Sequence, residues 1–142
     1  MDTNQNTSNL KDFELNIRIK LAFLWAAVTL CYLYGDYFEL YLPGKTAGLV
    51  SGDNLLNSPM KLLSAAILLA LPPLMVLFSI FLKPKINRLL HIFFGIFFTL
   101  IMLLIAIGSL TVWKSFYVFL ALFESVITAI IVVLAWKWPR KN

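Results

Sequence analysis

Long uninterrupted apolar runs recur along this chain, and they limit what it can fold into. A helix that crosses a bilayer needs about 20 mostly apolar residues, and four segments reach that length. They span about residues 21–42, 60–82, 87–110 and 115–138. Charged residues make up only 13% of the 142 residues, against roughly 25% in an average soluble domain. A water-soluble fold and a disordered chain are therefore excluded. We expect an all-α integral membrane protein, a single domain whose four helices form an antiparallel transmembrane bundle.

Breaking and capping residues mark the ends of the spans. Pro43-Gly44 ends the first span, while Ser58 and Pro59 are typical of the cap and the first residue of the second. Residues 43–58 are rich in Gly, Ser and Asn and are predicted to form an outer loop. Two interpretations of this loop stay open, a lid over its end of the bundle or a plain connector.

The basic residues predict the orientation of the bundle. Nine of the twelve Lys and Arg fall on one side of an even-numbered bundle: Lys11, Arg18, Lys20, Lys83, Lys85, Arg88, Lys137, Arg140 and Lys141. The other side holds Lys45, Lys61 and Lys114. The positive-inside rule then predicts that both termini are cytoplasmic. Because the basic residues flank apolar spans, we expect no nucleic-acid partner despite the net charge of +5.

The residues before the first span (1–20) are expected to form a cytoplasmic N-terminal segment. Its apolar residues Leu10, Phe13 and Ile17 share one helical face, with Asn9 or Ser8 as a cap. This pattern predicts a helix that extends the first span and lies along, or projects from, the inner surface.

Acidic side chains inside the spans are the strongest candidates for a functional site. At about 1.5 Å per residue, Asp36 lies roughly 9 Å and Glu124 roughly 14 Å inside the outer ends of their helices. No Lys or Arg within the spans can neutralise them there, so we expect Glu124 to be protonated or bonded to Tyr or Thr hydroxyls. The candidate ligand-binding residues are Tyr32, Asp36, Glu39, Tyr117, Glu124 and Thr128. A site that holds a ligand and a set of bonds between helices both stay open.

Other features give weaker signals. His91 lies near the cytoplasmic end of the third span and is interpreted as an interfacial histidine beside Arg88, in preference to a phosphate or lipid-headgroup contact. Trp25 is expected at headgroup level near the same end. Pro72-Pro73 is predicted to kink the second span. One histidine provides neither a zinc site nor a pair of haem ligands, and no catalytic motif is present. We therefore expect no catalytic residue, no metal and no cofactor.

Several short stretches together carry a resemblance to known proteins. They are Tyr34-Gly35-Asp36-Tyr37-Phe38, Pro43-Gly44, Met75-Val76-Leu77-Phe78-Ser79, Lys85-Ile86-Asn87-Arg88, Glu124 and Ala135-Trp136-Lys137-Trp138. The set resembles a family of small uncharacterised bacterial membrane proteins with four helices, DoxX-like in architecture. The resemblance implies a four-helix bundle in the bacterial inner (plasma) membrane. DoxX-like proteins are linked to quinone and thiol redox chemistry, but no redox motif matches here, so that role does not transfer.

Three functions stay open. In the first, the bundle binds or passes a small apolar ligand, a lipid or a proton at an outer-half site with intramembrane carboxylates. In the second, it is a non-catalytic partner subunit of a larger membrane complex. An enzyme is the least favoured, because His91 lies at the opposite end from the carboxylates. The lipid bilayer is the expected partner, and a homo-oligomer or a larger membrane complex stays open.

Overall fold

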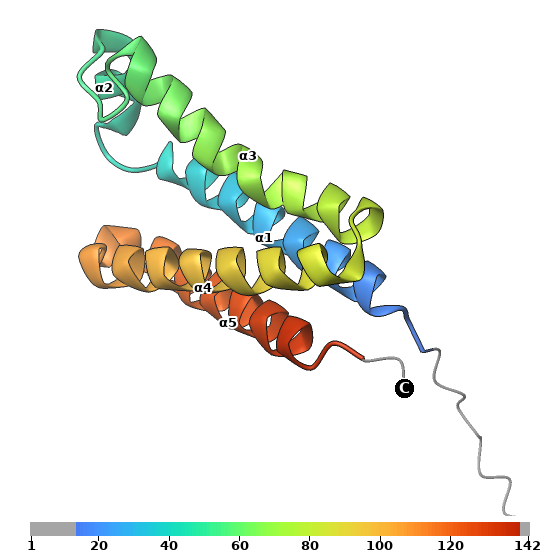
Figure 1. The fold of residues 1–142 in the computed structure, drawn as a ribbon. Helices are drawn as coiled ribbons and strands as arrows, with labels where there is room; N and C mark the ends of the chain where they lie inside the picture. The colour runs from blue at the N-terminus through green and yellow to red at the C-terminus, as the bar shows by residue number, and fades with distance from the viewer. Residues whose placement is uncertain (1–13, 140–142) are drawn as a thin grey trace, which may run out of the picture.

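A computed structural model describes residues 14–139, and all of its long elements are helices (Figure 1). They are α1 (Ile17–Glu39), α2 (Lys45–Ser51), α3 (Pro59–Phe81), α4 (Pro84–Gly108), a 3-10 turn η1 (Val112–Lys114) and α5 (Ser115–Trp136). Within the described residues there is no strand. Four stretches, α1, α3, α4 and η1 with α5, are long and apolar enough to cross a membrane. The predicted all-α fold with four segments able to cross a membrane is confirmed.

The first span begins earlier than predicted, at Ile17. Asn16 caps it, because its side chain accepts a hydrogen bond of 3.0 Å from the backbone N–H of Arg18. Residues 14–16 are not helical, so the prediction of a helix running unbroken from Asn9 or Ser8 into the first span is wrong. The residues on which that prediction rested, Ser8, Asn9, Leu10 and Phe13, lie outside the described part of the chain.

The predicted outer loop of residues 43–58 contains the short helix α2. Gly44 and Gly52 flank this helix with φ angles of 77° and 80°. A side chain at either position would be strained, because only glycine adopts this left-handed conformation readily. A continuous loop is therefore the wrong description. The pattern of Gly, Ser and Asn marked the two turns but concealed the seven-residue helix between them.

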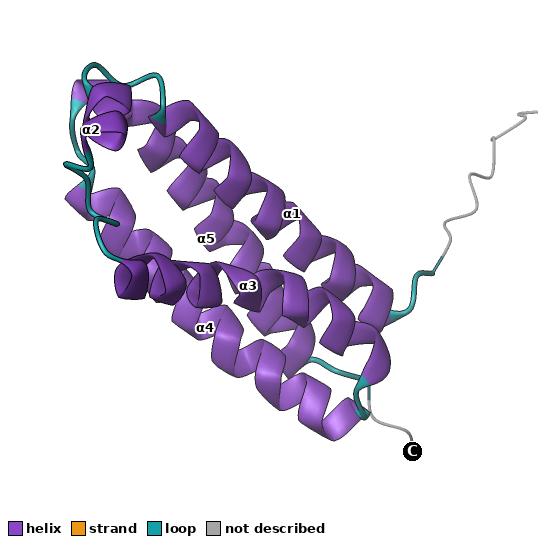
Figure 2. Ribbon diagram, turned by 90° about the horizontal axis from the view of Figure 1, so that it is seen from above, coloured by secondary structure: helices purple, strands orange, loops and turns teal. Residues whose placement is uncertain are grey.

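The four long helices form two pairs, α1 with α3 and α4 with α5, and α1 also contacts the second pair through α5. α1 packs against α3 on one side and against α5 on the other, while α5 packs closely against α4. The α1–α3 pair and the α4–α5 pair meet where α3 turns into α4, and they diverge toward the end that holds α2 (Figures 1 and 2). We call these two ends the termini end and the α2 end, because the described chain begins and finishes at the first (Figure 1).

The apolar core lies between α1, α3, α4 and α5. Its buried residues are Leu21, Trp25, Val28, Met75, Phe98, Ile127 and Ile131. Gly95 allows α4 and α5 to approach closely, since a Cβ atom there would lie 2.6 Å from Cγ2 of Val132. Small residues at such contacts are typical of membrane helices. α3 continues through Pro72 and Pro73 to Phe81, although two prolines remove two backbone donors from the helix.

Candidate functional site

Glu124 lies on the buried face of α5 and is only 3% exposed. It lines a cavity of about 20 Å³, which we call the chamber, together with Tyr32 and Gly35 of α1, Met102 of α4 and Tyr117 of α5. A site needs roughly 10–15 Å³ to hold one water molecule. The chamber therefore has room for about one molecule of that size and excludes a lipid or other organic ligand.

The carboxyl group of Glu124 has no polar partner in the described protein. Thr128 donates a hydrogen bond of 3.0 Å to the backbone carbonyl of Glu124, not to its side chain. Within residues 14–139, no hydroxyl and no cationic side chain pairs with the carboxyl group. The predicted bond from a Tyr or Thr hydroxyl is therefore not formed, and the carboxyl group faces the chamber.

Tyr32 brings a second polar group to the chamber. Its hydroxyl oxygen is buried and has no hydrogen-bond partner among the described residues. Leaving a buried hydroxyl unpaired costs about 1–3 kcal/mol, so a fold retains such a group where a small polar molecule can satisfy it. Tyr32 and Glu124, each with a polar group that no described residue pairs, thus line one water-sized space.

Three larger cavities open at the α2 end, and we call them together the mouth. Their volumes are about 280, 500 and 630 Å³, and Glu39 and Leu55 line all three. Asp36 lines the largest. Pockets of about 300–1,000 Å³ are typical of small-molecule sites. The mouth, and not the chamber, is therefore large enough for an organic ligand.

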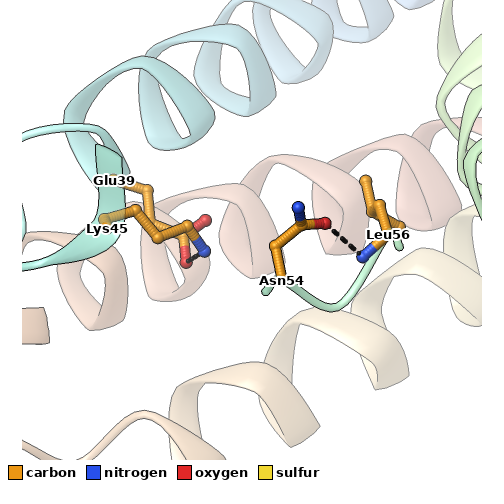
Figure 3. Close-up of polar contacts among 4 residues, drawn as sticks. All are labelled: Glu39, Lys45, Asn54 and Leu56. Carbon is orange, nitrogen blue, oxygen red and sulfur yellow. Dashed lines mark hydrogen bonds and ion pairs between the residues drawn. The ribbon is translucent and has the colours of Figure 1, made fainter. Parts of the chain in front are cut away.

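An ion pair and a turn shape the wall of the mouth. Nζ of Lys45 donates to Oε1 of Glu39 at 2.7 Å, which joins the first residue of α2 to the last of α1 (Figure 3). On the loop that follows α2, Oδ1 of Asn54 accepts a hydrogen bond of 2.9 Å from the N–H of Leu56 (Figure 3). Leu55, between them, is 84% exposed. The sequence indicated no partner for Glu39, because Lys45 lies outside the spans.

Tyr117 belongs to both parts of the site. It lines the chamber and also the 280 Å³ cavity of the mouth. The six predicted residues are therefore not around one pocket. Tyr32 and Glu124 lie at the chamber, Asp36 and Glu39 at the mouth, and Tyr117 between them.

Thr128 is the predicted residue that lies apart from both. It is fully buried, and its hydroxyl lies 2.7 Å from the hydroxyl of Thr99. The two threonines join α5 to α4. Within the described residues, Thr128 forms a hydrogen bond between two helices and lines neither the chamber nor the mouth.

A second polar cluster, toward the termini end, was not predicted. Nε1 of Trp25 donates a hydrogen bond of 2.8 Å to Nδ1 of His91, whose Nε2 lies 3.2 Å from Oγ of Ser79. Nδ2 of Asn87 donates to the backbone carbonyl of Ser79 at 2.7 Å. All four residues are fully buried. His91 and Trp25 are thus enclosed by the bundle and bonded to each other, an arrangement that the sequence did not predict, and their expected depth near the headgroups stays a prediction.

One comparison with known protein families gives a match over nearly the whole chain. Residues 10–142 match a family described as a family of unknown function, DUF6326. No curated protein matches the chain. No solved structure matches it either.

Proposed function

Because the chain belongs to DUF6326, a family of unknown function, its activity has to be argued from the site, and we propose that it is a membrane bundle that takes up a small ligand through the mouth. In this proposal Glu124 binds and releases a proton in the chamber next to that ligand. The protein is then a binding or translocating protein and not a soluble enzyme or a nucleic-acid binder.

The unpaired carboxyl group of Glu124 is the observation that supports this proposal most. It is 3% exposed, it lies in a membrane-spanning helix, and no cation or hydroxyl of the described chain pairs with it. Ionisable groups in such positions are costly, and they mark proton or substrate pathways in membrane proteins. A carboxyl group that served only to join helices would be expected to reach a donor on the neighbouring helix.

The arrangement of the two cavities supports the division of roles. The chamber is sized for water or a proton, whereas the mouth has the volume of a small-molecule site. Tyr117 lines both, so one side chain would lie next to a ligand in the mouth and next to the proton on Glu124. Toward the termini end, Phe98 packs against both Tyr32 of the chamber and Trp25 of the His91 cluster and so separates the two. Access to Glu124 is therefore proposed to be from the α2 end.

The orientation in the membrane is part of the proposal. The basic residues at the termini end favour that end as cytoplasmic by the positive-inside rule, and the mouth then opens on the outer side. The resemblance to DoxX-like bacterial proteins favours a bacterial inner membrane. We propose this likeness for architecture and location only, and no activity follows from it.

A carbodiimide that partitions into membranes tests the proposal. Such reagents add to a protonated carboxyl group in an apolar site, and the product rearranges to a stable N-acylurea that contains all atoms of both reactants. We expect one adduct on the intact detergent-purified protein, read by mass spectrometry and located on the α5 peptide. Glu124→Gln should abolish it, whereas Asp36→Asn should retain it.

The opposite results would overturn the proposal. If Glu124→Gln is labelled as fully as the wild type, or if no adduct forms at Glu124 at acidic pH, this carboxyl group does not exchange a proton with the α2 end. Labelling should fall as the pH is raised, because only the protonated acid reacts. The two substitutions are matched, since each replaces an acid by its amide.

A partner subunit is the second candidate, and the packing of α3 favours it. α3 packs against α1 and makes few contacts with α4, so most of its surface faces outward. Apolar residues of α3 such as Met60, Ile67 and Phe81 are largely exposed. Lipid, a second copy or a larger membrane protein are all able to cover this face. Co-purification of a stoichiometric second protein in mild detergent would favour the subunit over the ligand-binding bundle.

A further inference from the structure

The charges and cavity shapes of the mouth identify a class of ligand. We propose that the mouth binds a single-chain amphiphile with an anionic head group, such as a fatty acid. In this arrangement Lys114 pairs with the head group and the chain lies in the cavity between α1 and α3. The inference rests on the proposed function, because it names the ligand that the mouth would take.

Lys114 is the cation available at the mouth. It lines the 280 and 500 Å³ cavities. The other cation of the mouth, Lys45, is already paired with Glu39 at 2.7 Å. Lys114 has no ion-pair partner within the described part of the chain, although its side chain is only partly exposed. An anion next to Lys114 would therefore gain a charge-assisted pair without breaking one.

The groups around Lys114 also favour an anion. Ser109 is buried and lines the same 280 Å³ cavity, and Phe116 and Tyr117 belong to the first turn of α5. The N–H of Ser115, the first residue of α5, already bonds to the Val112 carbonyl of η1, so the start of α5 contributes only the partial positive charge of a helix N-terminus. We assign the head group to the wall formed by Lys114 and Ser109 beside the start of α5.

Acidic residues confine the head group to this side. Asp53 lines the 500 Å³ cavity, and Asp36 lines the 630 Å³ cavity. Glu39 stands between the cavities but is neutralised by Lys45. An anionic group near Asp36 or Asp53 would be repelled, so the same amphiphile has one favourable orientation.

The 630 Å³ cavity suits the hydrocarbon chain. It lies between α1, α2, the following loop and α3, and its walls are mostly leucine. The leucines are Leu40, Leu49, Leu55, Leu56, Leu62, Leu68 and Leu69. It adjoins the head-group cavity at Glu39 and Leu55, which line both. Burial of each methylene of a hydrocarbon chain in this cavity removes apolar surface from water and so favours binding.

One chain fits better than two. The other apolar cavity of comparable size, about 270 Å³, is lined by Ile96, Thr99, Leu100, Ala129, Val132 and Val133 on the α4–α5 side. It shares no residue with the mouth. That cavity is therefore separate from the proposed chain site, which we assign to one hydrocarbon chain. This assignment favours a fatty acid over an anionic phospholipid as the occupant.

Native mass spectrometry of the delipidated full chain in detergent tests the head group. The probes are palmitate and hexadecanol, which have the same chain length but differ in charge. We expect palmitate to bind the wild type and Lys114→Gln to weaken it about tenfold or more. Lys61→Gln is the matched control, because Lys61 bonds to Asn57 at 2.8 Å and lines no part of the mouth. Hexadecanol should bind Lys114→Gln and the wild type alike.

A pair of alanines on α3 tests the chain cavity. Ala65 lines the 630 Å³ cavity and the adjacent Ala66 does not. Ala65→Phe fills part of the cavity and is expected to weaken both palmitate and hexadecanol several-fold. Ala66→Phe, with the same added volume on an exposed face, should bind both as the wild type does.

The outcomes separate this inference from the proposed function. Equal palmitate binding by Lys114→Gln and Lys61→Gln would overturn the head-group assignment. So would binding of phosphatidylglycerol in place of palmitate. In both cases carbodiimide labelling of Glu124 would still test the proton site independently. If the wild type binds neither palmitate nor hexadecanol, the inference fails together with the ligand part of the proposed function.

Discussion

Nε1 of Trp25 donates a hydrogen bond of 2.8 Å to Nδ1 of His91, so that α1 and α4 are joined by two fully buried side chains. The bond fixes His91 as an acceptor at Nδ1, and its Nε2–H then faces Oγ of Ser79 on α3. Three helices therefore meet at one imidazole ring. Because α3 and α4 otherwise make few contacts, this cluster is the main polar connection between the two pairs of helices.

Trp25→Phe is expected to lower the thermal stability of the detergent-solubilised protein. The substitution removes the indole N–H and leaves the buried Nδ1 of His91 without a donor, which costs about 1–3 kcal/mol. The loss of packing against Phe98 adds to this cost. Trp136→Phe is the control, because Trp136 is 67% exposed and should tolerate the change. Equal melting temperatures for the two variants would show that the Trp25–His91 bond is not a stabilising connection.

Ser79→Ala tests the same cluster from α3. Ser79 is fully buried, its hydroxyl donates to the Met75 carbonyl at 2.6 Å and it lies 3.2 Å from His91. Its loss should destabilise the fold by about 1–3 kcal/mol, since His91 Nε2 then lacks a partner. Ser64 makes the same kind of bond, to the Met60 carbonyl, but is exposed. Ser64→Ala should therefore stay within about 0.5 kcal/mol of the wild type in thermal unfolding.

The sequence predicted the helices well because membrane spans depend on local properties. Run length and apolar content are visible residue by residue, and the structure has four spans close to the expected positions. The errors lie where side chains decide the boundary. Asn16 caps α1 before its apolar run begins. Gly44 and Gly52, which have positive φ angles, flank a short helix whose composition resembles that of a loop.

The site was harder to predict because it depends on which faces meet. His91 and Trp25 lie on polar faces of their helices, but periodicity does not reveal that the two faces contact each other. Thr128 shares a face with Glu124, yet it bonds to Thr99 and lines no cavity of the site. Lys45 neutralises Glu39 from a helix outside the spans. Depth in the membrane identified Glu124 from the sequence, whereas side-chain partners on other helices become visible only in the three-dimensional structure.

Gly95→Ala is expected to destabilise the contact between α4 and α5. The added Cβ would lie 2.6 Å from Cγ2 of Val132 and 3.4 Å from the backbone oxygen of Thr128, so the Val132 side chain or one of the helices must shift. Overpacking of this kind costs about 1–3 kcal/mol. Gly108→Ala is a matched control at the end of the same helix, where nothing lies within 4 Å. It should be neutral or raise stability by up to about 1 kcal/mol, and a similar loss at both positions would contradict the close approach at Gly95.

Glu124→Gln and Asp36→Asn together distinguish a functional carboxyl group from a structural one. Neither carboxyl group bonds to another side chain within residues 14–139, so replacing each acid by its amide removes no described bond. We expect the thermal stability of both variants to match or exceed that of the wild type, within about 1 kcal/mol. The measurement is unfolding in detergent across pH 5 to 9, where the wild type and Asp36→Asn should respond to ionisation of Glu124 and Glu124→Gln should not, because the buried charge would have no partner. A collapse of either variant at all pH values would instead show that the carboxyl group holds helices together, and the partner-subunit function would then be favoured.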